Sequence, residues 1–329
     1  MDLGITLDLG HDPEPLDQRF ARLAELTAHA GRLGYTMLST GEQHPTDGDY
    51  FHLPSPFVAL AALAPAAAET GMALGTGVIL LPAWDPLRLA YDVAVLDQLC
   101  GGRLVLGAAG GNPPTWARFG VSPDRLADRL DQTVQALKAA WAGQDFEGDL
   151  VGGLGPHLKP RPARPGGPPV IVGGMAGRAL RRAAELGDGW FGGTNYQLSR
   201  QIVPTVERYH QRCDGAGRPR GEVLVNRLAV VVERESEVEA AAGPALDLLR
   251  LYTRIGSARH PDGTPVTPDD IRLGSALVGD LAVIGTVAQA REQLAAYDAA
   301  GVTRLQLRVQ PAGVSDDVAR RTLELLAAS

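Results

Sequence analysis

The sequence predicts a (β/α)8 barrel, an α/β fold in which parallel strands alternate with helices, as a single domain over residues 1–329. Three observations support this prediction. Short apolar runs alternate with stretches of helical periodicity along the whole chain. The runs lack the polar alternation of half-exposed strands, which is typical of parallel strands buried on both faces. There are eight such runs, and that number favours a closed barrel over an open, doubly wound sheet.

Each expected strand in the first half of the chain is followed by a helix. The strands cover residues 3–9, 36–40, 72–81 and 103–109. Their helices cover, in the same order, residues 16–33, 56–70, 86–99 and 126–141. The second half supplies strands at residues 169–174, 189–193, 222–233 and 303–309, with helices at residues 178–187, 198–212 and 316–328.

Two connections are longer than the loops of an ordinary barrel and indicate insertions. One follows the fourth strand, at residues 110–169, and ends in a stretch rich in proline, arginine and glycine. The other lies between the seventh and eighth strands, at residues 234–302, where helical patterns cover residues 237–251 and 287–300. We expect both insertions to fold over the active site, with residues around 250–285 as a lid that excludes water.

Composition and charge argue against several classes of protein. The net charge of −7 and the isoelectric point near 5.5, without a cluster of lysine and arginine, argue against a nucleic-acid partner. No basic segment precedes the first apolar run, and no stretch of about 18 apolar residues occurs, so we expect neither secretion nor a membrane span. The only cysteines, Cys100 and Cys213, favour free thiols in a reducing compartment, and we expect a cytoplasmic protein.

Three polar residues follow the second strand, namely Glu42, Gln43 and His44. The carboxyl ends of barrel strands form the active site, so position alone makes these residues candidates. His44 is a candidate general base or hydrogen-bond donor, because an imidazole titrates near neutral pH. The alternative is a loop histidine bonded to Glu42 or to the backbone. The histidines show no metal-ligand spacing, and we predict no metal site.

A glycine-rich turn follows the fifth strand, where Gly173 and Gly174 lead directly into a helix. Backbone N–H groups at a helix start are candidates for binding a phosphate, because they lack intrahelical partners and the helix dipole favours an anion. The candidate donors here are Met175, Ala176 and Gly177. Gly192 and Gly193 follow the next strand and would lie beside them. The alternative is a tight turn that needs glycine only for its dihedral angles.

Several segments, in their order and spacing, resemble the bacterial luciferase-like monooxygenase family nearly from end to end. They are GYTMLSTGEQH, LGTGVILLP, PLRLAYDVAVLDQLCGGRLVLGAAGG, LKPRPARP, PPVIVGG with ALRRAAELGDGW, and GTVAQAREQLAAYDAAGVTRLQL. The resemblance implies a barrel, often a homodimer, that binds reduced FMN or the deazaflavin F420 at its mouth. Members that use FMN typically form a C4a-peroxyflavin that oxygenates an organic substrate, whereas members that use F420 transfer a hydride.

The resemblance implies roles for residues after the second and third strands. Gly77–Val78 is expected to form the non-prolyl cis peptide on which the isoalloxazine ring rests, a bond that is rare in proteins. The family's Glu-His-His motif appears here as Glu42-Gln43-His44, so its first histidine is replaced by Gln43. His44 then becomes the catalytic candidate, with Glu42 beside it.

The resemblance also implies how the cofactor phosphate and the substrate are bound. Luciferases carry a cysteine and a phosphate-binding arginine at the end of the fourth strand, where this chain has Ala109 and Gly110. Phosphate binding then depends on the glycine-rich turn and on another arginine. The candidates, in order of preference, are Arg125, Arg129 and Arg178. Asn112 and Trp116 are expected to face the substrate, and the alternative for Trp116 is a place in the core of the insertion.

Three functions follow from these features. The first is an FMNH2-dependent monooxygenase that oxidises a small organic substrate with molecular oxygen. Because the chain has no NAD(P)H fingerprint, a separate flavin reductase would supply the reduced FMN. The second is an F420-dependent oxidoreductase. The third is a flavin-binding protein without catalysis, which is supported by the two departures from the family pattern, at Gln43 and Gly110. The alanine-rich helix at residues 56–70 is apolar on more than one face, so we expect it to contact a partner subunit in a homodimer.

Overall fold

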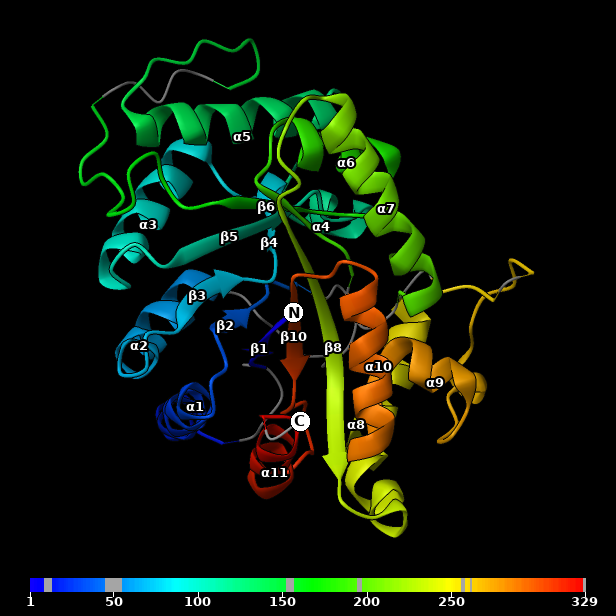
Figure 1. The fold of residues 1–329 in the computed structure, drawn as a ribbon. Helices are drawn as coiled ribbons and strands as arrows, with labels where there is room; N and C mark the ends of the chain where they lie inside the picture. Colours follow the sequence, from blue (N-terminus) through cyan, green and yellow to red (C-terminus); the bar gives the residue numbers. More distant parts are fainter. Residues whose placement is uncertain are drawn as a thin grey trace.

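Eight parallel strands close into a barrel, as predicted (Figure 1). The computed structural model describes residues 1–8, 14–44, 55–151, 157–193, 197–255, 258–260 and 262–327. The last barrel strand, β10, pairs with both β1 and β8, which closes the sheet on itself. Around the barrel the strands are β1 (Asp2–Thr6), β2 (Met37–Thr40), β3 (Ala73–Thr76) with its continuation β4 (Ile79–Leu80), β5 (Leu104–Ala109), β6 (Val170–Gly173), β7 (Gly189–Phe191), β8 (Glu222–Val232) and β10 (Arg304–Arg308).

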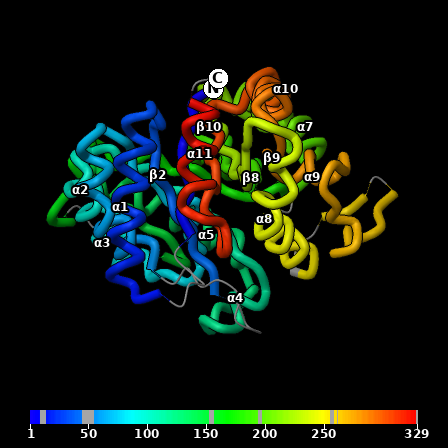
Figure 2. The backbone as a smooth tube through the Cα atoms, turned by 90° about the horizontal axis from the view of Figure 1, so that it is seen from below, coloured from blue at the N-terminus to red at the C-terminus, as the bar shows by residue number. Residues whose placement is uncertain are grey.

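Helices cover the outside of the barrel, and Figure 2 shows α1, α2 and α3 on one side of the molecule and α8 and α9 on the other. Most of them were expected from the helical periodicity of the sequence. They are α1 (Leu16–Arg32), α2 (Pro56–Ala68), α3 (Pro86–Leu99), α5 (Leu126–Ala142), α6 (Gly177–Glu185), α7 (Ser199–Gly215), α8 (Glu235–Ile255), α10 (Val287–Ala299) and α11 (Asp316–Ala327).

Two short helices and two 3-10 turns lie outside the predicted pattern. They are α4 (Pro113–Arg118), α9 (Ala276–Leu281), η1 (Leu81–Ala83) and η2 (Pro268–Asp270). Each of the two helices has six residues, which is fewer than two turns, so no apolar period could reveal it. Among all the described helices, none is long and apolar enough to cross a membrane.

One strand is missing from the prediction. The sequence predicts only helices in residues 234–302, and this is wrong for β9 (Ala282–Thr286), which lies between α9 and α10. β9 pairs in parallel with the second half of β8, from Leu228↔Ala282 to Val232↔Thr286. Its partner is a part of β8 that continues beyond the barrel, so the strand depends on a distant pairing that local periodicity cannot reveal.

β8 contributes to two apolar cores, one after the other. Because side chains alternate along a strand, every second residue shares a face. Leu224 lies on the inner face, in the cluster that fills the barrel floor with Met37, Val105, Ile171 and Phe191. The later residues on that face, Leu228, Val230 and Val232, belong instead to a second core with α8 and β9. One face of β8 therefore lines the barrel in the first half of the strand and packs against α8 in the second half.

The second core includes much of the segment expected to act as a lid. Residues 256–257 and 261 of that segment lie outside the described residues. Ala258, Val266, Ile271 and Leu277 are buried in the second core. Asp280 at the end of α9 hydrogen-bonds Ser199 at the start of α7. These contacts favour a roof on the β8 side of the barrel mouth, and closure over a ligand stays a prediction.

Candidate active site

Glu42 and His44 lie just past the end of β2, and a 2.7 Å hydrogen bond joins His44 Nε2 to Glu42 Oε1. The other oxygen of the buried carboxylate, Oε2, accepts hydrogen bonds of 2.8 Å from the backbone N–H of Leu80 and from the indole N–H of Trp84. A carboxylate can only accept, so Nε2 carries the hydrogen of the neutral ring and Nδ1 is left as an acceptor. Three donors thus hold Glu42, and Glu42 fixes the orientation and tautomer of His44.

The other ring nitrogen of His44 is Nδ1. No hydrogen bond to Nδ1 occurs among the residues that the structure describes. The alternative expected for His44 was a loop histidine bonded to Glu42 or to the backbone, and the structure does contain the hydrogen bond to Glu42. The same contact is the one that orients a catalytic imidazole, as the carboxylate does in serine hydrolases. The geometry therefore makes His44 a group that can accept or donate a proton at Nδ1.

Aromatic side chains enclose this pair. The ring of Phe119, directly after α4, contacts the His44 ring edge to face, with centroids 4.8 Å apart. Trp84 contacts Phe57 at the start of α2 in the same manner, at 5.0 Å. The His44 side chain is 15% exposed. The insertion after the fourth barrel strand thus reaches the site, as expected, although no local signal in the sequence singled out Phe119.

The peptide bond between Gly77 and Val78 is cis, which confirms the geometry implied by the resemblance. This segment is tied to β2 by two backbone hydrogen bonds of 2.9 Å, from Gly77 N–H to Thr40 O and from Glu42 N–H to Val78 O. Backbone hydrogen bonds therefore connect the cis segment directly to the strand end that carries the Glu42–His44 pair. The role of this bond as a support for a cofactor ring stays a prediction.

Two glycines make room for the chain around the cis segment, Gly41 directly after β2 and Gly107 on β5. A Cβ on Gly41 would lie 3.0 Å from Gly77 O, and a Cβ on Gly107 would lie 2.0 Å from Thr76 O. The β3–β4 strand also has one extra residue here relative to β5. Gly75 pairs with Val105 before the cis segment, and Ile79 pairs with Ala108 after it. A bulge of this kind re-aims the chain next to many active sites. The single strand predicted over residues 72–81 is therefore divided into β3 and β4.

The glycine-rich turn has the geometry expected of a phosphate site. Gly174 has φ of +125°, and α6 begins three residues later with Ala176 as N-cap and no side chain capping it. No capping side chain therefore accepts a hydrogen bond from the backbone N–H groups of Met175, Ala176 and Gly177. Binding of a phosphate there stays a prediction.

Gly192 and Gly193, after β7, have a packing reason to be glycine. A Cβ on Gly192 would lie 2.6 Å from the ring of Trp190, and a Cβ on Gly193 would lie 2.5 Å from Cδ1 of Ile202. A Cβ on Gly173 would lie 3.1 Å from Cβ of Ala109. These contacts give a packing reason for the three glycines, whereas the dihedral reason expected for the turn applies to Gly174, with its positive φ. A contact with a cofactor stays a prediction for all three.

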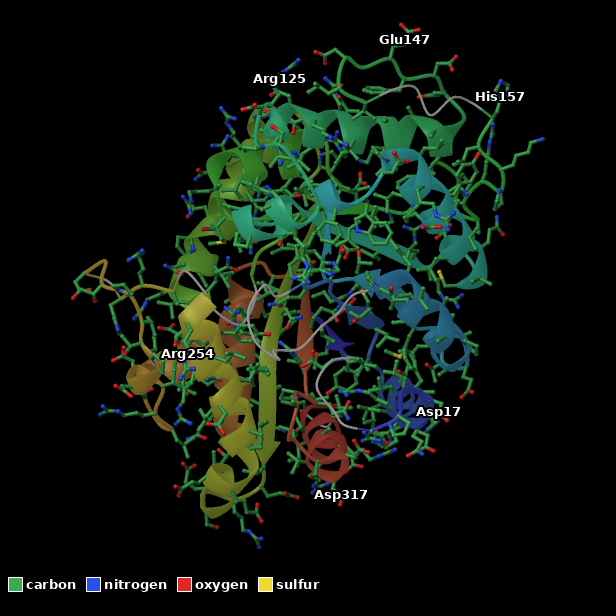
Figure 3. The ribbon with its side chains drawn as sticks, turned by 180° about the vertical axis from the view of Figure 1, so that it is seen from behind. Asp17, Arg125, Glu147, His157, Arg254 and Asp317 are labelled. Atoms are coloured by element: carbon green, nitrogen blue, oxygen red, sulfur yellow. The ribbon has the colours of Figure 1, made fainter. Side chains whose placement is uncertain are left out.

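The arginines expected to assist phosphate binding are exposed. Arg125 is 54% exposed, at the start of α5, and pairs with Asp149 at 2.7 Å and Asp128 at 3.5 Å. Figure 3 shows Arg125 at the outer edge of the molecule, at the same end as Glu147. Its charge is engaged by two carboxylates, so the structure does not favour it as the phosphate ligand. Arg129 and Arg178 are also exposed.

Arg212 is a further candidate that the sequence did not reveal. Its Nη2 lies 3.9 Å from the position of a Cβ on Gly177, at the start of α6. It belongs to α7, 35 residues along the chain from that glycine, so only the packing of α6 against α7 brings the two together.

Asn112 and Trp116 have structural roles in the insertion. Asn112 is the N-cap of α4, and its Oδ1 accepts from Thr115 N at 3.1 Å and from Thr115 Oγ1 at 2.9 Å. The indole N–H of Trp116 donates to Gly110 O at 2.6 Å, and its ring packs partly buried against the main core. These bonds favour the core alternative for Trp116. Substrate contact stays a prediction for both residues.

A buried ion pair at the mouth was not expected. Arg308, at the end of β10, donates to Asp8, just after β1, through Nε at 2.7 Å and also through Nη2. Its Nη1 bonds the hydroxyl of Tyr252 from α8. The sequence did contain a sign of this pair. In β10, RLQLR, the polar residues at 304, 306 and 308 alternate with leucines, so all three point to the same face of the strand.

Metal binding has no support in the described ranges. No group of three or more histidine, cysteine, aspartate or glutamate side chains there could hold a metal ion.

A closed barrel with an oriented histidine at the carboxyl end of its strands is the architecture of a (β/α)8-barrel enzyme. The model of one family, the luciferase-like monooxygenases, matches residues 1–304. The chain belongs to the luciferase-like monooxygenase family, as its resemblance implied.

Curated relatives use different cofactors. The chain is 29% identical over 299 residues to a putative coenzyme F420-dependent oxidoreductase of Mycobacterium tuberculosis, covering 74% of this chain and 80% of that protein. It is 26% identical over 243 residues to the oxygenase component of a flavin-dependent trigonelline monooxygenase of Acinetobacter baylyi, covering 70% of this chain. That match, like those to uncharacterised mycobacterial proteins, spans 64% of the relative's length.

Solved structures share the fold over the whole chain. A monooxygenase of Streptomyces bottropensis, RslO1, superposes with a TM-score of 0.82 at 24% identity, covering 100% of this chain and 98% of the other. The oxygenating constituent of 3,6-diketocamphane monooxygenase from Pseudomonas putida, in complex with FMN, superposes with a TM-score of 0.78 at 19% identity, covering 99% and 96%. At these identities the similarity establishes the fold alone.

Proposed function

We propose that the protein is an FMNH2-dependent monooxygenase that oxidises a small organic substrate and receives its reduced flavin from a separate reductase. The observation that carries the proposal is the Glu42–His44 pair, in which Glu42 bonds the histidine through its side chain and the cis Gly77–Val78 segment through its backbone N–H. The relative from Acinetobacter is named as an oxygenase component, and this supports a separate reductase.

The residues at the mouth fit a flavin. The start of α6 offers uncapped N–H donors for a phosphate, and the backbone at Gly77, which carries no side chain, lies close to both Ser39 and the ring of Phe191. Bound reduced FMN would supply the two electrons with which one atom of O2 becomes water while the other is transferred to the substrate.

His44 would hold or move a proton in that reaction. Its Nδ1 can accept a proton, and the resulting cation is stabilised by Glu42 at 2.7 Å on the other side of the ring. Phe119 covers the ring and limits the access of water to it, which favours direct proton transfer to a bound ligand.

The second candidate is an F420-dependent oxidoreductase, which the relative from Mycobacterium tuberculosis supports. The same histidine would then bind or protonate the substrate during hydride transfer. The third candidate, a flavin-binding protein without catalysis, gives no reason for a carboxylate that fixes one tautomer of a histidine at the mouth.

The test is to mix the protein anaerobically with photoreduced FMN, and then with oxygenated buffer, in a stopped-flow spectrometer. A long-lived species that precedes oxidised flavin would support the monooxygenase. Oxidation at the rate of free flavin would contradict it, and F420 binding and hydride transfer would be measured next. His44→Ala should change the decay of that species with flavin affinity nearly unchanged, and His157→Ala, at an exposed position, is the matched control.

We also propose a homodimer, with α3 as well as α2 in the interface. Leu87, Tyr91, Val95 and Leu99 follow one another at intervals of four on α3, and each is at least 36% exposed. Residues at this spacing share one face of a helix. Val58 on α2, which packs beside α3, is 69% exposed. A continuous apolar stripe of this kind is typical of a subunit contact.

A further inference from the structure

Four polar side chains line the barrel between its apolar floor and its mouth. Asn226 of β8 donates to Thr6 Oγ1 at 2.9 Å, and the Thr6 and Ser39 hydroxyls are 2.7 Å apart. Ser39 Oγ donates to Gln306 Oε1 of β10 at 3.3 Å. All four residues are buried. We call this set the polar layer, and its members come from four adjacent strands.

Two atoms of the polar layer have no partner in the part of the chain that the structure describes, namely Asn226 Oδ1 and Gln306 Nε2. Gln306 and Asn226 are directly paired in the parallel register of β10 and β8, so their carboxamides start from neighbouring positions on the inner wall. One atom is an acceptor and the other a donor. Buried polar groups are bonded in nearly all proteins, so an unmatched donor and acceptor on neighbouring strands are able to bind a polar group that enters the barrel.

The polar layer adjoins the cis segment. Ser39 Oγ lies 3.4 Å from the position of a Cβ on Gly77. The ring of Phe191, from β7, lies 3.5 Å from the same position. The inner wall near Gly77 is therefore polar towards β2, β1, β10 and β8 and apolar towards β7. A flat ring beside this segment would direct its polar end towards Asn226 and Gln306.

The sequence provides space for the Gln306 carboxamide in particular. On β1, Gly4 is paired with Gln306, and a Cβ there would lie 2.5 Å from both Nε2 and Oε1. Without that side chain, the carboxamide can lie flat across β1. Leu224 and Met37, two residues before Asn226 and Ser39, form the apolar floor directly below.

We propose that Asn226 and Gln306 bind the pyrimidinedione edge of the cofactor ring, Asn226 Oδ1 accepting its N3–H and Gln306 Nε2 donating to an adjacent carbonyl oxygen. The inference rests on the proposed function, and it holds for FMN and F420 alike because both rings carry this edge. It assigns an orientation, with the polar end of the ring on the β8–β10 side and the opposite end towards β7.

The test compares reduced FMN with reduced 3-methyl-FMN, in which the N3–H is replaced by a methyl group. We expect wild-type protein to bind FMN about 10 to 100 times more tightly, because methylation removes one hydrogen bond and leaves a buried acceptor unpaired. In Asn226→Leu the ratio of the two dissociation constants should fall towards 1. Affinities are measured anaerobically by equilibrium dialysis.

Gln293→Met is the matched control, since Gln293 on α10 also has a buried, unbonded Oε1 but lies outside the barrel. It should keep the wild-type ratio. Equal affinity of the wild type for FMN and 3-methyl-FMN would overturn this inference and leave the proposed function standing. Absence of binding to both FMN and F420 would instead overturn the proposed function. The wild-type comparison needs no variant to fold.

Discussion

Replacement of Glu42 by glutamine tests the central feature of the site. The variant keeps one carbonyl oxygen, which can still accept from Leu80 N and Trp84 Nε1 as Oε2 does now. The new NH2 group then faces His44 Nε2, and two donors cannot bond to each other. We therefore expect His44 to exchange tautomers, so that Nε2 accepts and Nδ1 carries the hydrogen.

The expected loss of stability is modest. Three bonds to an ionised carboxylate, at about 1.5–3 kcal/mol each, become bonds to a neutral amide at about 1 kcal/mol each. The variant no longer buries a charge, which offsets part of that loss. We expect the free energy of unfolding to fall by about 1–3 kcal/mol, measured by denaturant titration. A catalytic effect of about 10²–10⁴ on proton transfer at Nδ1 should accompany it.

The tautomer itself is read from the ¹⁵N chemical shifts of a histidine-labelled sample. Trp84→Phe is the matched control, because it removes one donor to the same carboxylate, leaves the negative charge in place, and should preserve the Nε2–H tautomer of His44. If Glu42→Gln and the wild type show the same tautomer, Glu42 does not orient His44 in the way that the hydrogen bonds indicate.

Three further outcomes are expected. Asp8→Asn removes the carboxylate that pairs with the buried Arg308 and should lower the free energy of unfolding by about 3–5 kcal/mol, whereas the double variant with Arg308→Met should recover most of it. Burial lowers the pKa of His29, so the unfolded state takes up a proton first as the pH falls below about 6.5, and stability should decline there. His29→Gln should flatten that decline in thermal melts, and an unchanged slope would exclude His29 as its source. Leu99→Glu together with Val95→Glu on the α3 stripe should yield monomers in sedimentation equilibrium, and a persistent dimer would place the interface elsewhere.

The barrel could be predicted because its information is local. Each strand carries its own apolar run and each long helix its own period, so the order of elements is recorded in short windows of sequence. The cis Gly77–Val78 bond could be predicted from the resemblance, whereas the surrounding glycines alone do not predict it. β9 and α4 were missed because one depends on the extension of β8 and the other is shorter than the period that reveals helices.

The site could be predicted only in part. His44 and Glu42 are two residues apart and follow a strand, so both position and motif indicated them. Their neighbours Leu80 and Trp84 lie 38 and 42 residues away, and Asn226 meets Thr6 across 220 residues. Such contacts follow from the closure of the barrel, and no single segment encodes them. Asn226 and Gln306 could have been noticed in the sequence, because each is a polar residue within a largely apolar strand.

The double use of β8 makes the rim of the barrel asymmetric. Its first half is held by β7 and β10, and its second half by five consecutive pairs with β9 and by the side chains of α8. To swing this flank outward, the protein would have to break a parallel ladder and expose an apolar core at once. We therefore expect the β8 flank to stay fixed during turnover, and substrates and products to pass over the opposite rim, where β2, β3 and β5 end.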